Sequence, residues 1–451
     1  MDLIKYLSAT VFTPLYDLKE GRRVGRELKH LYKSQHWSAE RIRDRQLAQL
    51  REMIDYAVAH SAFYRRAYGS AGVGATDITS LSDISKFPVL TKDDIRANLN
   101  DMVSDEYPPA TLFAKRTGGS TGVPLRLYVD KEAMTLKLAA TRRHNSWANY
   151  RTGDKLAAIW GDTDKKYSWK ERLLNSLIYR TIYLDTLKLD EAYMLDFVAR
   201  VKRFKPSVLM GHAHSLYVFS LFAEENGISD LPFQSIISTS EVLYDSERAK
   251  IEEVFGPIVF DRYGCEELSI VASECEKHEG LHINADGLYV EVIGGDEVNP
   301  GKLVITDLWN YGMPLIRYEV GDMATTIPAP CPCGRGLPRL GKVYGRTSDF
   351  LITPEGKMIS GISILDTFTI HVPGVKQVQI VQDQIDELVF KVVKGPNFGD
   401  ISIQTISEKV PTFFGRRMRH KIEIVETIPQ TARGKYRFSI CNVPLRGNRG
   451  N

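Results

Sequence analysis

The chain has 451 residues, of which 43% are hydrophobic and 25% charged, a composition that excludes a mostly disordered protein. Lysine and arginine number 59 and aspartate and glutamate 56, so the net charge of +3 gives no argument for a nucleic-acid partner. Five cysteines do not make a disulfide framework in a chain of this length. No run approaches the ~20 apolar residues of a membrane span, and Asp2 and Lys5 interrupt the apolar N-terminus. We therefore expect no transmembrane segment, no signal peptide and a cytoplasmic location.

The N-terminal segment, to about residue 105, is predicted to be mainly helical. Over 38–65, apolar side chains recur at spacings of three and four, which predicts an amphipathic helix with Ser38 as its N-cap. A second helix is expected to begin at Thr91, where Thr91 and Asp94 fit a capping box.

From about residue 110 to 325, short apolar runs alternate with helical segments. The runs lie at 155–161, 207–212, 235–240 and 302–308. Strands separated by helices indicate α/β layers rather than an all-β sandwich.

The C-terminal part follows a different pattern, after a stretch near 328–350 that is rich in proline, glycine and cysteine. Strands are expected at 387–393 and 421–428, with a short amphipathic helix at 401–410 between them. The sequence therefore predicts an α/β protein with a large multi-layer N-terminal domain and a small α+β C-terminal domain, at 1–348 and 349–451.

Two segments carry residues that suit a nucleotide. In 117–122, three glycines let backbone N–H groups approach an anion and three hydroxyls can donate to phosphate oxygens, although the loop lacks the ending of a Walker A motif. Tyr263 offers a flat face for a purine ring, and a nearby carboxylate could hold Mg²⁺ against phosphates. Alone, the first segment is also typical of a flexible turn and the second of a strand end with an acidic turn.

Six short segments in a fixed order carry a resemblance to a known family. They read TGGSTGVP (117–124), SEVL (240–243), YGCEE (263–267), YEVGD (318–322), GRTSD (345–349) and PQTARGK (429–435). This order resembles the adenylate-forming acyl-CoA synthetase superfamily, and more narrowly the phenylacetate–CoA ligase branch with its relatives from capsular polysaccharide clusters. The resemblance spans about 38–440. It implies an enzyme that converts a carboxylic acid and ATP into an acyl-adenylate and pyrophosphate, and then passes the acyl group to coenzyme A.

The resemblance also implies which residues hold ATP. It assigns the β- and γ-phosphates to Thr117, Gly118, Gly119, Ser120, Thr121 and Gly122. Ser240 and Glu241 match a stretch that lines the adenine site. Tyr263 matches the residue that stacks on adenine, and Gly264 allows close approach beside it.

The remaining matches concern the magnesium ion, the ribose and the hinge. Glu267, not Glu266, falls where the family places the Mg²⁺ carboxylate. Asp322 matches the acid that binds both ribose hydroxyls, and Arg346 matches an arginine that faces ribose or phosphate. Asp349 falls at the hinge between an N-terminal adenylation domain and a C-terminal lid domain.

Lys435 matches the lysine that reaches the α-phosphate and the carboxylate. Negative charge concentrates at the α-phosphate in the transition state of adenylation, so a cation that binds there at that stage lowers the barrier. A lysine on a mobile lid can also be withdrawn from the site before the second step. The alternative is an ordinary surface lysine. The sequence departs from the family at Arg433, just before Gly434, and at Glu319 and Val320, where Arg and Thr are more usual.

The cysteines suggest a metal site. Cys331 and Cys333 form a tight Cys-x-Cys turn, and upstream Cys275 precedes His278 and His282. Three sulfurs and one histidine nitrogen would form a tetrahedral set that suits structural Zn²⁺ and leaves no open position for catalysis. We favour His282, which begins a predicted strand, over His278, which lies in a charged turn. The alternative is three thiols without a metal.

Other features leave alternatives open. Relatives line the acyl pocket from regions comparable to those of His212 and His214, which can equally be structural histidines. The basic run at 416–421 would meet the phosphates of coenzyme A or form a solvated face. Cys265 is expected to be a packing residue. The acceptor is coenzyme A by default, the alternatives being a sugar or amine in surface-polysaccharide assembly, or a nucleotide-binding relic without turnover, which the intact motifs argue against. The sequence fixes neither the acid nor the oligomeric state.

Overall fold

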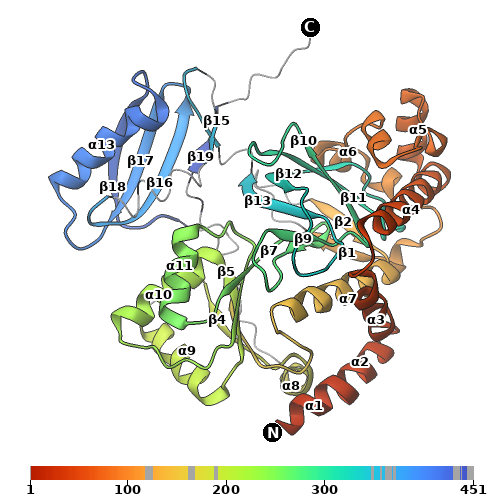
Figure 1. Ribbon diagram of the computed structural model, residues 1–451, viewed down its shortest axis with the longest axis horizontal. Coiled ribbons are helices and arrows are strands. Elements are labelled where there is room, and N and C mark those ends of the chain that lie inside the picture. Colours follow the sequence, from red (N-terminus) through yellow and green to blue (C-terminus); the bar gives the residue numbers. More distant parts are fainter. Residues whose placement is uncertain are drawn as a thin grey trace.

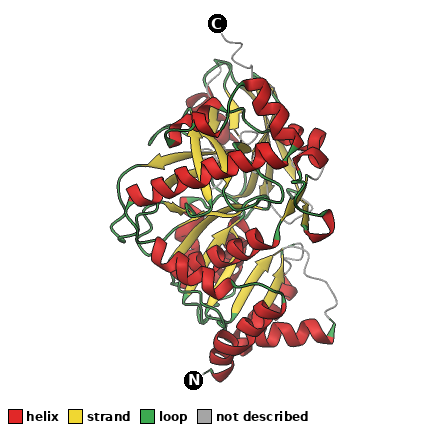
Figure 2. Ribbon diagram, turned by 90° about the vertical axis from the view of Figure 1, so that its right-hand side faces the viewer, coloured by secondary structure: helices red, strands yellow, loops and turns green. Residues whose placement is uncertain are grey.

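The computed structural model describes residues 2–116, 125–160, 168–186, 191–346, 350–355, 358–360, 368, 372–429, 437 and 439–443. Figure 1 shows a large body that includes the N-terminus, and a smaller domain, drawn in blue, near the C-terminus. Seen from the side, the strands lie in the interior and helices run along the outside (Figure 2). The predicted α/β class is confirmed.

The N-terminal part is helical, as predicted. Its helices are α1 (Leu3–Leu7), η1 (Ser8–Phe12), α2 (Thr13–Lys19), α3 (Val24–Ser34), α4 (Ala39–His60), α5 (Ala62–Ala71), η2 (Ala75–Asp77), η3 (Leu81–Lys86), α6 (Lys92–Met102) and η4 (Pro109–Thr111). The prediction of one helix over 38–65 was wrong, because Ser61 has an extended backbone and its side chain caps the second helix by accepting from the Tyr64 N–H at 3.5 Å. The capping box is confirmed, since the N–H groups of Thr91 and Asp94 donate to each other's side chains at 2.9 and 3.2 Å.

A mixed sheet of eleven strands forms the centre of the described part of the large body. Its strands are β3 (Leu156–Trp160), β4 (Thr181–Asp185), β5 (Val208–His212), β6 (Ser235–Thr239), β7 (Val259–Cys265), β8 (Ser269–Ser273), β9 (Leu281–Ile283), β10 (Leu288–Ile293), β11 (Gly301–Asp307), β12 (Tyr318–Ile327) and β13 (Arg339–Arg346), in the spatial order 10-11-12-13-9-8-7-6-5-3-4. In this order, the five neighbouring strands β4, β3, β5, β6 and β7 run parallel to one another. Every neighbouring pair in the rest of the sheet, from β7 and β8 to β11 and β10, is antiparallel. The sheet therefore joins two halves of different construction.

Each half of the sheet has its own helical cover. The helices that follow residue 129 in the large body are α7 (Lys131–Trp147), α8 (Trp169–Leu174), η5 (Asn175–Tyr179), α9 (Glu191–Phe204), α10 (Ala213–Glu225) and α11 (Asp245–Phe255). Phe197 of α9 and Phe219 of α10 are fully buried in the core beneath the parallel half. Leu50 and Met53 of α4 are fully buried in the core of the antiparallel half. A separate hairpin of β1 (Phe113–Arg116) and β2 (Arg126–Val129) brackets the glycine-rich segment.

The smaller domain is an α+β unit, as predicted. Its elements are β14 (Phe350–Ile352), β15 (Met358–Ser360), β16 (Val375–Gln384), β17 (Glu387–Lys394), α13 (Asp400–Phe414), β18 (Arg419–Val425) and β19 (Ser439–Cys441). Phe390 of β17 and Phe414 of α13 are fully buried in its core, which also receives Tyr244 from the large body. Gln377 of β16 lies 3.4 Å from His214 of α10, so the two parts are in contact. The predicted boundary at 348/349 stays a prediction.

Candidate functional site

Two residues from different predicted motifs meet directly. The Tyr263 hydroxyl, on β7, donates a hydrogen bond of 2.6 Å to Asp322 Oδ2, on β12. Burial, together with the neighbouring carboxylate, raises the pKa of Tyr263 well above its usual value, so the hydroxyl stays protonated and donates. A flat ring can stack on a purine base, and a carboxylate beside it can accept hydrogen bonds from the ribose hydroxyls, so the pair suits a purine nucleoside.

Glu267 is held by a buried tyrosine of the YEVGD segment. The hydroxyl of Tyr318, which is fully buried, donates to Glu267 Oε1 at 3.0 Å. Burial raises the pKa of Tyr318, which keeps that hydrogen in place. Sequence reasoning missed Tyr318, although it stands four residues before Asp322 and opens the same motif. The two tyrosines therefore orient the two carboxylates predicted to serve magnesium and ribose.

The glycine-rich segment is connected to this site through the residue just before it. The Lys115 ammonium, on β1, donates to the backbone carbonyl of Glu266 at 3.1 Å and to the Ser269 hydroxyl at 3.3 Å. Lys115 thus brings the start of the β1–β2 connection against the YGCEE segment. Residues 117–122 themselves lie outside the described residues, as do Asp349 and Lys435.

The backbone positions of Gly264 and Arg346 also contribute to the site. A Cβ on Gly264 would stand 2.6 Å from the Ser269 carbonyl oxygen, so any side chain there would break the pairing of β7 with β8. The backbone of Arg346 lies opposite Asp322 in the register of β12 and β13, which joins the third motif to the fourth. The Arg346 side chain is outside the described residues.

Ser240 and Glu241 follow β6 at the carboxyl edge of the parallel strands. Ser240 has a left-handed backbone, with φ of 69°. Glu241 Oε2 accepts from the His214 backbone N–H at 3.1 Å, and the His214 ring lies 2.7 Å from Glu247 Oε1. Glu241 therefore caps the start of α10, and His214 is a buried, paired histidine, in agreement with the structural alternative.

Aromatic rings gather at the same edge of the sheet. Trp160 ends β3 and His212 ends β5, and their ring centroids are 4.6 Å apart. In open α/β sheets, ligands bind outside the carboxyl ends of parallel strands. Burial raises the pKa of the Cys265 thiol well above its usual value, which agrees with a packing role rather than a nucleophilic one.

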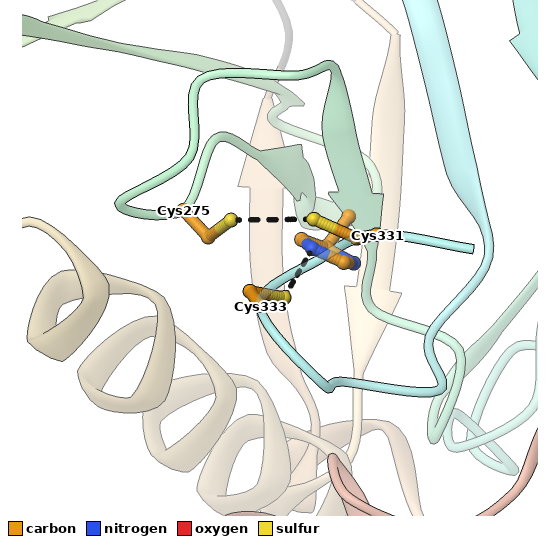
Figure 3. Close-up of side chains that lie close together, drawn as sticks. Cys275, Cys331 and Cys333 are labelled. Carbon is orange, nitrogen blue, oxygen red and sulfur yellow. Dashed lines mark hydrogen bonds between the residues drawn. The ribbon is translucent and has the colours of Figure 1, made fainter. Parts of the chain in front are cut away.

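The predicted metal ligands come together. The ligand atoms of Cys275, His282, Cys331 and Cys333 all lie within 4.8 Å of one another. Figure 3 shows the three thiols turned toward one another, with the Cys275 and Cys331 sulfurs 3.8 Å apart. The Cys333 sulfur is 3.3 Å from His282 Nε2, and Nδ1 of the same ring lies 3.2 Å from the Leu337 carbonyl oxygen. His278 instead lies 3.0 Å from Glu274, outside the cluster.

Four ligands around zinc have characteristic separations. With Zn–S of about 2.3 Å and Zn–N of about 2.0–2.1 Å, a tetrahedron places two sulfurs about 3.8 Å apart, and a sulfur and a nitrogen about 3.6 Å apart. The observed 3.8 and 3.3 Å are close to these values. The Leu337 carbonyl suits an Nδ1–H donor, a tautomer that leaves Nε2 as the ligand atom. The residues present therefore fit zinc.

The basic run at 416–421 is partly engaged by acids. Arg419 lies 3.0 Å from Asp386, and Lys421 lies 3.0 Å from Glu387. These pairs sit on the surface of the C-terminal domain, which favours the solvated-face alternative for these two side chains.

Comparison with known proteins finds relatives over most of the chain. Residues 351–442 match the family described as the CapK C-terminal domain. CapK of Staphylococcus aureus is 26% identical over 405 residues, covering 87% of each chain. A phenylacetate–coenzyme A ligase of Thermus thermophilus is 25% identical over 412 residues, covering 82% of this chain and 86% of the relative. A crystal structure of 2-hydroxyisobutyryl-CoA ligase, in the postadenylation state with R3-HIB-AMP, has a TM-score of 0.72 at 23% identity and covers 91% of both chains.

The fold is thus that of the adenylate-forming ligases. Within that class, the chain is a homologue of CapK and of the phenylacetate–coenzyme A ligases. The resemblance predicted from the six segments is confirmed, and these relatives support the predicted enzyme class, an AMP-forming CoA ligase.

Proposed function

We propose that this protein activates a carboxylic acid with ATP, releases pyrophosphate, and transfers the acyl group from the adenylate to coenzyme A. One observation carries the proposal: two separate motifs, YGCEE and YEVGD, are joined by the hydrogen bonds from Tyr263 to Asp322 and from Tyr318 to Glu267. Lys115 links them to the start of the glycine-rich segment. Residues of a chance set of turns would not converge in this way.

Each side chain has a task in the first step. Tyr263 stacks on adenine, with Ser240 and Glu241 nearby at the end of β6, and Asp322 accepts from both ribose hydroxyls. Glu267, oriented by Tyr318, is the carboxylate for Mg²⁺, a hard ion that prefers oxygen ligands and offsets phosphate charge. In this proposal Thr117 to Gly122 bind the β- and γ-phosphates, and Arg346 serves the ribose or a phosphate. Asp349 is the hinge of the C-terminal lid.

The test of the reaction is ATP–pyrophosphate exchange across a panel of aromatic and aliphatic acids. We expect exchange with at least one acid, and an aromatic acid is the first choice because Trp160 and His212 form an aromatic wall at the carboxyl edge of the sheet. Adding coenzyme A should then give a thioester detectable by mass. If no acid in the panel supports exchange, the proposal fails.

Lys435→Ala should slow adenylation by about 10²–10³-fold, the usual cost of losing one contact that stabilises charge in the transition state. Thioester formation from synthetic acyl-AMP and coenzyme A should stay near normal, because that step does not create the same charge. Lys421→Ala is the control, an exposed lysine of the same domain that pairs with Glu387. Normal adenylation by Lys435→Ala would contradict the role.

One observation favours an acyl acceptor other than coenzyme A. The domain that would act as the lid matches the CapK C-terminal domain over 351–442. In this alternative the adenylate is made in the same way, but the acyl group passes to a sugar or amine of surface-polysaccharide assembly. Adenylation without any thioester in the mass assay would favour it over transfer to coenzyme A.

We also propose that Cys275, His282, Cys331 and Cys333 bind a structural zinc ion. The three sulfurs and one nitrogen are the donor set that zinc takes in closed sites, and their separations support it. The ion would fix the loop that connects β12 to β13, and β13 carries Arg346 toward the nucleotide site. Its role is to hold this connection, not to take part in the reaction.

A further inference from the structure

The first helical segment of the chain buries polar side chains and exposes apolar ones. Over α1, η1 and α2, the small or polar side chains of Ser8, Thr13 and Asp17 are buried against the protein. The apolar side chains face outward instead, with Leu15 at 60% and Leu18 at 67% exposed. A surface helix normally buries its apolar stripe, so this arrangement indicates a partner on the outer side.

A neighbouring segment adds to the same surface. Trp169 and Leu173 of α8 are exposed, and the following helix η5 packs against η1, with the ring of Tyr179 6.5 Å from that of Tyr16. Figure 1 draws α1, α2 and α8 together at the lower edge, away from the C-terminal domain. We call this surface the N-terminal apolar face, formed by Leu3, Val11, Leu15, Leu18, Trp169 and Leu173.

Exposed bases outnumber exposed acids around this face. Asp2 pairs with Arg180 at 2.5 Å and Asp17 with Arg142 at 2.8 Å, whereas Glu20 and Glu171 are exposed. Four bases are also exposed and take part in no ion pair among the described residues: Lys19, Arg23, Lys170 and Arg172. The result is an apolar surface with a basic rim.

We propose that the N-terminal apolar face docks on an anionic lipid bilayer. Apolar side chains of an interfacial helix enter the region between headgroups and acyl chains, a tryptophan suits the headgroup level, and lysines and arginines attract anionic lipid. A second copy of this chain fits less well, because a two-fold contact would set the two basic rims against each other. No described helix is long and apolar enough to cross a membrane, so the attachment is peripheral.

The test is cosedimentation of the full chain with vesicles. The protein should bind vesicles of equal parts phosphatidylcholine and phosphatidylglycerol, and bind vesicles of phosphatidylcholine alone much more weakly. Added salt should weaken the binding, since the basic rim acts through screened charges. Leu15→Glu combined with Leu18→Glu should lower the partition coefficient by about tenfold or more, because two apolar side chains no longer enter the bilayer.

A matched control and a second measurement keep the test decisive. Val298→Glu changes a side chain that is 79% exposed between β10 and β11, far along the chain from the face, and should bind like the unchanged protein. Leu15 and Leu18 have exposed side chains, so their replacement should leave the melting temperature unchanged. Sedimentation velocity reports the oligomeric state. A dimer that the double variant dissociates, or no binding to either vesicle, would overturn the proposal. Exchange activity is unaffected by either outcome, so failure here is distinct from failure of the proposed reaction.

Discussion

Asp322→Ala should lower kcat/KM for ATP in the exchange assay by about 10²–10⁴-fold. The proposed carboxylate accepts from two ribose hydroxyls, and hydrogen bonds to a charged group contribute about 1.5–3 kcal/mol each. Two such bonds together give about 3–6 kcal/mol, which corresponds to that range. The substitution also removes the acceptor of the Tyr263 hydroxyl, which lies 2.6 Å from Asp322. The measurement is the initial exchange rate as a function of ATP concentration.

Tyr263→Phe separates the two contributions. This variant keeps the aromatic ring for stacking but removes the hydroxyl that donates to Asp322. We expect a loss of about tenfold or less, because one hydrogen bond is lost and the ribose contacts remain. A loss in Tyr263→Phe as large as that in Asp322→Ala would mean that Asp322 acts by positioning the tyrosine. In that case its proposed contact with ribose would be wrong.

Cys331→Ser should abolish zinc binding. The unchanged protein is expected to carry close to one zinc per chain by elemental analysis, and the variant close to none. The ligands join the turn before β9 to the loop before β13, so losing the ion should also lower the melting temperature. A site that stabilises the large body by a few kcal/mol corresponds to a shift of about 5 °C. A strong chelator should reproduce the shift in the unchanged protein and leave the variant unaffected.

Histidine variants identify the fourth ligand. His282→Ala should lose the metal, since His282 Nε2 lies 3.3 Å from the Cys333 sulfur. His278→Ala should keep it, because that ring lies beside Glu274. Cys441→Ser changes a thiol of the C-terminal domain outside the cluster and serves as the control. Full zinc content in Cys331→Ser would show that the cluster is not the site.

The sequence by itself determined the class of protein and the residue types of the candidate site. Glycine at 264, the carboxylates at 267 and 322 and the tyrosine at 263 stand in ordered motifs, so their roles could be proposed from short segments. The choice of His282 over His278 was also possible, because a strand start and a charged turn differ in local pattern. The helix over 38–65 was predicted without its break, since Ser61 ends α4 through its backbone and side-chain contacts rather than through periodicity.

Only the tertiary structure decided which side chains meet. Tyr318 and Glu267 are 51 residues apart and Tyr263 and Asp322 are 59 apart, so no local pattern links them. The same holds for the outward apolar stripe at the N-terminus: its residues are visible in the sequence, but a helical period does not say which face the rest of the chain covers. Packing settles that, because the buried surface is chosen by neighbours that come from far along the chain.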